Sequence, residues 1–182
     1  AALLTPHTST STHPGGGPRH FAMHPQLPFG YANNELDMTV TAFQFDTEKG
    51  TLKKLQSVST IPDSVSERSR FSTAEIAIHP SGKFLYVSNR GHDSISLFGI
   101  NEQSGKLSLK RVEPTHCQTP RHFAIAPGGK RLYAAGQASG TVTAFTIDPT
   151  TGKLSFTNRL TKVPKPVCII FSRPLSSGPE KP

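Results

Sequence analysis

Three segments of this chain repeat one another, and this repetition restricts the possible folds more than any other feature. The copies are PRHFAMHPQLPFGYANNELDMTVTAF from residue 18, TAEIAIHPSGKFLYVSNRGHDSISLF from residue 73 and PRHFAIAPGGKRLYAAGQASGTVTAF from residue 120, so the steps are 55 and 47 residues. The first step is longer because a polar insertion, residues 61–72, follows the first copy. PVCIIF, which starts at residue 166, resembles the beginning of a fourth copy.

Each copy reads as four short strands separated by turns. In the second copy the strands are EIAIH, FLYVSN, SISLFGI and LSLKRV, and Gly82 and Gly105 stand where a hairpin needs a positive φ. A repeat of roughly 40 to 50 residues with four strands is typical of a β-propeller blade. The sequence therefore predicts an all-β fold, a partial propeller over residues 17–171 with blades at about 17–60, 73–114 and 119–162 and a further first strand at 163–171.

Three blades and one strand do not close a ring, because propellers usually have about four to eight blades. We expect closure to need blades from a missing N-terminal part or, as a second possibility, self-association. Residues 1–16 are then a linker or the end of a preceding blade, and residues 172–182 a C-terminal tail.

The formal charge of +8 and the two widely spaced cysteines limit the function classes. The charge permits nucleic acid, an acidic membrane surface or a small anion as partner and does not choose among them, although no run of five basic residues and no interleaved aromatic platform occurs. No apolar stretch is long enough to cross a bilayer, and there is no CxxC pair or other metal motif. We expect a cytoplasmic protein without a nucleic-acid or membrane partner and without a metal site.

Blade topology predicts which polar residues meet. In a four-stranded meander, the entry to the inner strand and the connection between the second and third strands lie at the same end of the blade. One rim is therefore expected to collect Arg19, His20, Glu35, Glu75, Arg90, His92, Arg121 and His122.

Structural roles compete with a functional role at this rim. Asn34 and Asn89 are interpreted as residues that end strands, Asp93 as a residue that binds turn amides, and His24 and His79 as turn residues at the opposite end. For the glutamate and arginines of the rim, an ion pair between blades is the alternative.

The motifs GPRH at residues 17–20, NE at 34–35 and SNRGHDSI at 88–95 resemble those of the seven-bladed propeller lactonases, which include 6-phosphogluconolactonase and carboxy-cis,cis-muconate lactonizing enzyme. The resemblance covers residues 15–171, which correspond to the C-terminal half of that family. HPQLPFGY, at residues 24–31, departs from the usual glycine-lysine turn.

The resemblance implies a cofactor-free lactonase, a carboxylic ester hydrolase of carbohydrate metabolism acting on a small anionic lactone. It implies a catalytic role for Arg19, Glu35 and Arg90, and substrate binding by His20, Glu75, His92, Arg121 and His122. A further family histidine lies in an earlier blade that this chain does not contain, so we expect the isolated chain to be inactive. Muconate cycloisomerisation and a non-catalytic interaction platform are the alternatives.

Overall fold

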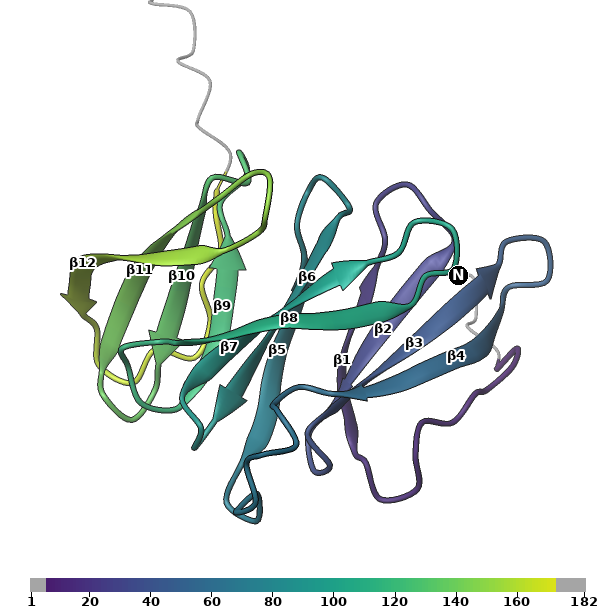
Figure 1. Ribbon diagram of the computed structural model, residues 1–182, viewed down its shortest axis with the longest axis horizontal. Helices are drawn as coiled ribbons and strands as arrows, with labels where there is room; N and C mark the ends of the chain where they lie inside the picture. The colour runs from purple at the N-terminus through teal and green to yellow at the C-terminus, as the bar shows by residue number, and fades with distance from the viewer. Residues whose placement is uncertain (1–5, 173–182) are drawn as a thin grey trace, which may run out of the picture.

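The computed structural model describes residues 6–172 and contains three four-stranded antiparallel sheets, which confirms the all-β prediction. Figure 1 shows the sheets side by side in a fan, with the first and third at its two ends. Within the described residues no helix is present, and hence none is long and apolar enough to cross a membrane. The strands are β1 (Pro18–Met23), β2 (Phe29–Asn34), β3 (Thr39–Asp46), β4 (Thr51–Ser59), β5 (Ser72–Ile78), β6 (Phe84–Arg90), β7 (Ser94–Ile100), β8 (Leu107–Pro114), β9 (Pro120–Ile125), β10 (Arg131–Gly136), β11 (Thr141–Ile147) and β12 (Leu154–Lys162).

Each sheet is a simple meander, in which every strand pairs with the next one along the chain. The turns before β4, β8 and β12 are built alike. Asp46, Asn101 or Asp148 accepts two backbone N–H groups through its side chain, and a glycine with positive φ follows four residues later. Gly105 and Gly82 have φ values of 67° and 77°, which confirms the hairpin role predicted for these two glycines.

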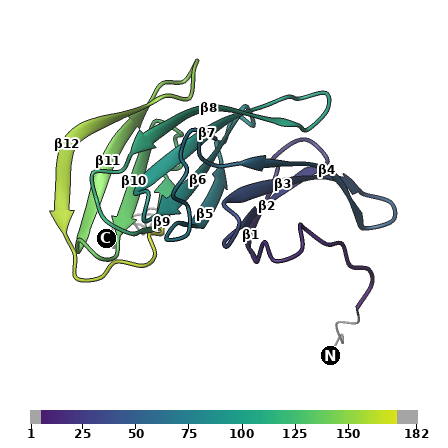
Figure 2. The same ribbon diagram turned by 60° about the horizontal axis from the view of Figure 1, so that its bottom comes forward.

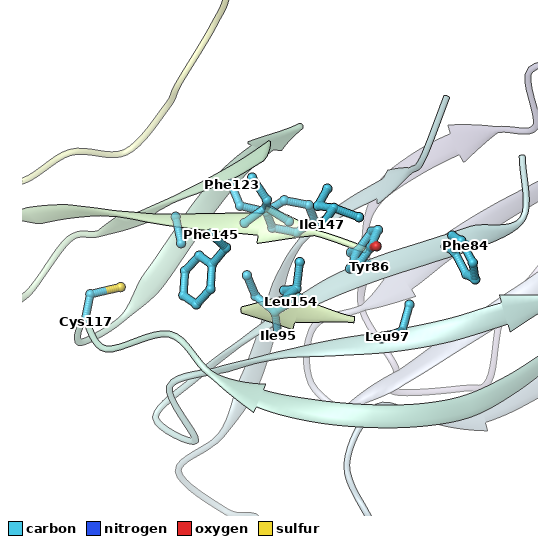
Figure 3. Packing of buried hydrophobic residues seen from close by; sticks show 11 residues of the cluster. Phe84, Tyr86, Ile95, Leu97, Cys117, Phe123, Phe145, Ile147 and Leu154 are labelled. Carbon is cyan, nitrogen blue, oxygen red and sulfur yellow. The ribbon is translucent and has the colours of Figure 1, made fainter. Parts of the chain in front are cut away.

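The sheets pack face to face, and this packing repeats along the fan. Tyr31 of the first sheet donates a hydrogen bond to the carbonyl of Gly105 in the second at 3.0 Å, and Tyr86 of the second donates to Gly152 in the third at 2.7 Å. Around each tyrosine lies an apolar cluster, and Figure 3 shows the one between the second and third sheets. The second sheet is thus buried on both faces, whereas the two outer sheets each have an open face.

The first strands of the three sheets, β1, β5 and β9, are neighbours in the fan, as the view in Figure 2 also shows. Each of these inner strands pairs irregularly near its start. The register shifts between Pro18 and His20 in β1 and between Thr73 and Ile76 in β5. In β9 it shifts between Pro120 and His122. Such bulges change the direction of successive side chains, which positions the site described below.

The structure corrects one sequence expectation, the first strand of a fourth blade at residues 163–171. This segment forms no strand in the structure. No described strand forms a ladder with it; instead, the Ile169 N–H donates to the ring of His122 in β9 at 3.3 Å, and Phe171 packs on Tyr133 of β10. Most of the predicted C-terminal tail, and the first residues of the predicted N-terminal linker, lie outside the described residues.

Candidate active site

The polar rim lies where the inner strands begin and where the second strand of a sheet turns into the third. Arg19 and His20 are the second and third residues of β1, Glu75 lies in β5, and His122 lies in β9. Glu35 follows β2 directly, in the first sheet. Arg90 ends β6 and Arg121 lies beside His122 in β9, so the rim combines residues of three sheets.

An ion-pair cluster forms around Glu35. Its Oε1 accepts a short hydrogen bond from Arg90 Nη2, and its Oε2 lies 3.8 Å from Arg19 Nε. Arg90 Nη2 also donates to the Thr73 carbonyl at 3.2 Å. The arginine side chains are only 18% and 14% exposed, whereas that of Glu35 is 34% exposed, so the carboxylate is the part of the cluster that water reaches most easily.

Burial and a neighbouring cation act on Arg19. Desolvation, together with the positive charge of Arg90, lowers the pKa of the Arg19 guanidinium, and Glu35 opposes this shift. Arginine stays protonated at neutral pH even so. The rim therefore holds a carboxylate between two permanent positive charges.

The bulge in β1 brings two consecutive side chains into one cluster. Arg19 Nη1 lies 3.0 Å from Nε2 and 3.4 Å from Nδ1 of the adjacent His20. In a regular strand, adjacent side chains point to opposite faces. The amide freed by the irregular pairing is not lost, because His20 N–H donates to Asn33 Oδ1 at 3.1 Å.

A second polar cluster surrounds Glu75. Its Oε2 lies 3.1 Å from His20 Nδ1 and 3.1 Å from His122 Nε2, so two imidazoles from the two neighbouring sheets share one carboxylate oxygen. Its Oε1 accepts the Ile76 N–H at 3.0 Å, and its own N–H donates to Ser88 Oγ at 3.0 Å. Burial lowers the pKa of His122, and the Glu75 carboxylate partly offsets this shift.

Two predicted site residues stand apart from these clusters. Arg121 makes no ion pair with any described residue, although its charge contributes to the lowered pKa of Arg19. His92 contacts Ser94 Oγ at 2.7 Å and packs against Phe71 in a T-shaped arrangement, and burial lowers the pKa of His92. The structure thus brings together six of the eight predicted residues through described contacts.

The residues assigned structural roles do have such roles. Asn34 is the last residue of β2 and Asn89 the last but one of β6, and both donate to hydroxyl groups of the next strand. Asp93 accepts the Gly91 N–H, as predicted for a turn, and also the N–H of Thr119, which directly precedes β9 of the third sheet.

His24 and His79 hold turns and, in addition, approach the carbonyls of Gly82 and Gly129 in the next sheet at 3.0 and 2.9 Å. The sequence did not predict these links between sheets.

Sequence reasoning missed Asn33 and Ser88, which occupy the same position in β2 and β6. Both are buried and accept the backbone amides of His20 and Glu75. The available signal was a polar side chain inside an otherwise apolar strand, in YANN and YVSN. The third repeat has Ala135 at this position.

The arrangement is suited to a reaction of an anionic ester. A carboxylate can take a proton from water, and guanidinium groups can bind carboxylate, phosphate or oxyanion oxygens in a fixed geometry. Among residues 6–172, no three His, Cys, Asp or Glu side chains are placed to hold a metal ion.

Known proteins share the sequence pattern and the fold of this chain. The model of a family described as lactonase, 7-bladed beta-propeller, matches residues 1–171. A 6-phosphogluconolactonase of Bacillus subtilis is 40% identical over 121 residues, which are 66% of this chain and 34% of that protein. One of Formosa agariphila is 43% identical over 113 residues, which are 61% of this chain and 31% of that protein. The chain therefore spans about a third of the length of these curated relatives.

Solved structures show the same relationship. The periplasmic gluconolactonase PpgL of Pseudomonas aeruginosa superposes with a TM-score of 0.80 at 30% identity, covering 86% of this chain and 43% of that one. A putative 6-phosphogluconolactonase of Bacteroides fragilis gives 0.77 at 34% identity, covering 85% and 41%. The three sheets are therefore propeller blades, and the chain belongs to the family of seven-bladed β-propeller lactonases.

Proposed function

We propose that the rim hydrolyses a small anionic sugar lactone of the 6-phosphogluconolactone type. The observation that carries this proposal is the Glu35 carboxylate held between Arg90 and Arg19, two residues from different sheets. The names of the relatives support the same reaction class.

The proposed reaction uses Glu35 as the base. Glu35 takes a proton from a water molecule while the water oxygen attacks the lactone carbonyl carbon, and the carbonyl oxygen becomes an oxyanion. When the tetrahedral intermediate collapses, the bond to the ring oxygen breaks, and this oxygen receives the proton to leave as a hydroxyl group. The product is the open-chain hydroxy acid.

The arginines supply the positive charge that this reaction requires. Among the described hydrogen bonds Arg90 uses only Nη2, so Nη1 remains available for a substrate oxygen. A donor directed at a developing oxyanion is typically worth about 10²- to 10³-fold in rate. We assign oxyanion or carboxylate binding to Arg90 and Arg19.

Arg121 is proposed to bind the substrate's distal anionic group, because it has no ionic partner among residues 6–172 and lies in β9 beside His122. His20, His92 and His122 are half-buried, and they are proposed to contact the substrate as well. A lactone without phosphate leaves Arg121 unpaired, so the phosphorylated substrate is expected to bind more tightly.

Activity is proposed for a closed propeller only. The third sheet has an open face, and the matched relatives are about three times as long as the matched region. Closure by further N-terminal blades is proposed, with self-association as the alternative. The isolated chain is expected to be inactive.

The compartment is also a proposal. Cys117 is buried and Cys168 exposed, and both are free thiols, which fits a reducing compartment such as the cytoplasm. The periplasmic relative from Pseudomonas aeruginosa shows that the family also occurs outside it.

The test is hydrolysis of 6-phosphogluconolactone by a closed propeller in which residues 17–171 replace the matching region of the Bacillus subtilis relative. We expect Glu35→Gln and Arg90→Ala to lower kcat/KM by at least about 100-fold, with Arg111→Ala, an exposed arginine in β8 of the second blade, as the control. Arg121→Gln should raise KM for the phosphorylated lactone more than for gluconolactone. Unchanged rates in both Glu35→Gln and Arg90→Ala would refute the assignment, and turnover of a carboxymuconate instead would identify a cycloisomerase.

A further inference from the structure

Glu75 occupies the middle of a continuous chain of contacts across three blades. His122 of β9 and His20 of β1 approach the same oxygen of its carboxylate at 3.1 Å, from opposite sides of β5. The Glu75 side chain is 12% exposed, the least of these three. The order of contacts is His122, Glu75, His20, Arg19, Glu35 and Arg90.

His20 connects this chain to Arg19 through its ring. Because Arg19 Nη1 lies at 3.0 and 3.4 Å from both ring nitrogens, the guanidinium lies over the imidazole rather than in line with one nitrogen. The same Nη1 donates to the Ala74 carbonyl at 2.5 Å. Among the described contacts, Glu75 is the only polar partner of the His20 ring besides Arg19.

Protein groups already contact both carboxylate oxygens of Glu75. Its Oε1 accepts the Ile76 N–H, and its Oε2 faces the two imidazoles. The Ile169 N–H donates to His122 Nδ1, so neutral His122 carries its proton on Nε2, the nitrogen that faces Glu75. Such a carboxylate has little capacity left for a substrate, but it can fix the orientation of both rings.

We propose that Glu75 is a positioning residue, which holds Arg19 in its site orientation through the His20 ring and does not contact the substrate. This proposal refines the sequence expectation that Glu75 binds the substrate. It rests on the proposed function only in that Arg19 is taken to bind the lactone.

The test uses side-chain NMR of the 182-residue chain, comparing wild type with Glu75→Gln and with Glu48→Gln, an exposed carboxylate in the turn before β4. Glu75→Gln should shift the Arg19 Nε–Hε signal and the ring ¹⁵N signals of His20. It should also lower the pKa of His122 further, since the carboxylate that favours the protonated ring is gone. Glu48→Gln should change none of these signals. Unmoved Arg19 and His20 signals in folded Glu75→Gln would overturn the proposal.

A second variant, His20→Phe, keeps a flat ring beside Arg19 but removes the nitrogen that faces Glu75. Its side chain is 38% exposed, so the fold should tolerate the change. The Arg19 signal should move as it does in Glu75→Gln, and an unmoved signal would overturn the proposal even if Glu75→Gln does not fold.

Kinetics separate this proposal from the proposed function. In the closed propeller, Glu75→Gln should lower kcat/KM in the wild-type background but not in an Arg19→Ala background, because its effect passes through Arg19. An equal loss of kcat/KM in both backgrounds would contradict the proposal that Glu75 acts by positioning Arg19. Absence of lactone hydrolysis in the wild type would refute the function and leave the NMR result to decide the role of Glu75.

Discussion

Two rim histidines, His92 and His122, are packed so that burial lowers the pKa of each. The unfolded chain binds a proton at each imidazole below about pH 6.5, whereas the folded chain resists protonation until a lower pH. Folding therefore releases protons in this range. The free energy of unfolding should be highest above about pH 6.5 and fall as the pH decreases from there through the folded pKa values.

Urea unfolding between about pH 5 and pH 7.5 measures this dependence. His92→Gln and His122→Gln should each reduce the loss of stability at the acidic end, while His13→Gln, whose side chain is 66% exposed, should leave it unchanged. An acidic loss that is identical in all four proteins would mean that these two histidines do not contribute to it.

The single residues of the rim show where prediction from sequence succeeds. Arg90 and Glu35 were expected to meet because meander topology places both at one end of their blades, and they do. The sharing of Glu75 by two imidazoles was not predictable, because it depends on the bulge that turns His20 beside Arg19. A bulge leaves no pattern in the sequence, since its residues are the same as those of a regular strand.

At the scale of elements, one hydrogen bond recurs within the apolar contact between neighbouring blades. Tyr86 is fully buried and donates to Gly152, and burial raises its pKa far above the ordinary value. Tyr133 occupies the same position in the third blade, is half-buried, and donates no hydrogen bond to any described residue. Tyr133 can therefore serve as the control for a substitution that removes the Tyr86 hydroxyl.

We expect Tyr86→Phe to lower the free energy of unfolding by about 1 kcal/mol or somewhat more, because the Gly152 carbonyl loses its donor. Tyr133→Phe should change it by less than about 0.5 kcal/mol. Denaturant unfolding of both variants provides the comparison. Equal effects would show that the hydroxyl does not join the blades.

The blades themselves were predictable from the repeat and its glycines, whereas the last segment was not. Residues 166–171 have the sequence of an inner strand, but a strand needs a ladder partner, and no described segment pairs with them. Similarly, His24 was expected to hold a turn, but its contact with Gly82 in the next blade depends on how the blades pack. Local patterns specify elements, whereas packing between elements decides such contacts.

On the scale of the whole molecule, the outward face of the third blade is the clearest sign of an unfinished ring. A hollow of about 420 Å³ lies there, and it is lined by Tyr133, Val142 and Ala144 with arginines at its border. The corresponding residues of the second blade, Tyr86, Ile95 and Leu97, are buried against the third.

A charged substitution distinguishes the open face from a covered one. In the 182-residue chain, Val142→Lys should cost less than about 0.5 kcal/mol, while Ile95→Lys should prevent folding because it buries an unpaired charge. In a closed propeller, Val142→Lys should be as damaging as Ile95→Lys. Circular dichroism and urea unfolding of the two variants measure these effects. If Val142→Lys greatly lowered the free energy of unfolding of the isolated chain, the open face would already be covered there by self-association.

The convergence of distant residues at one rim is most directly tested by a double-mutant cycle between Glu35 and Arg90, which lie 55 residues apart in the sequence. Urea unfolding of Glu35→Gln, Arg90→Gln and the double variant gives their coupling energy. For a partly buried pair that joins two blades, the structure predicts a coupling of about 1 kcal/mol. Strictly additive effects would contradict the pairing, and with it the site built around Glu35.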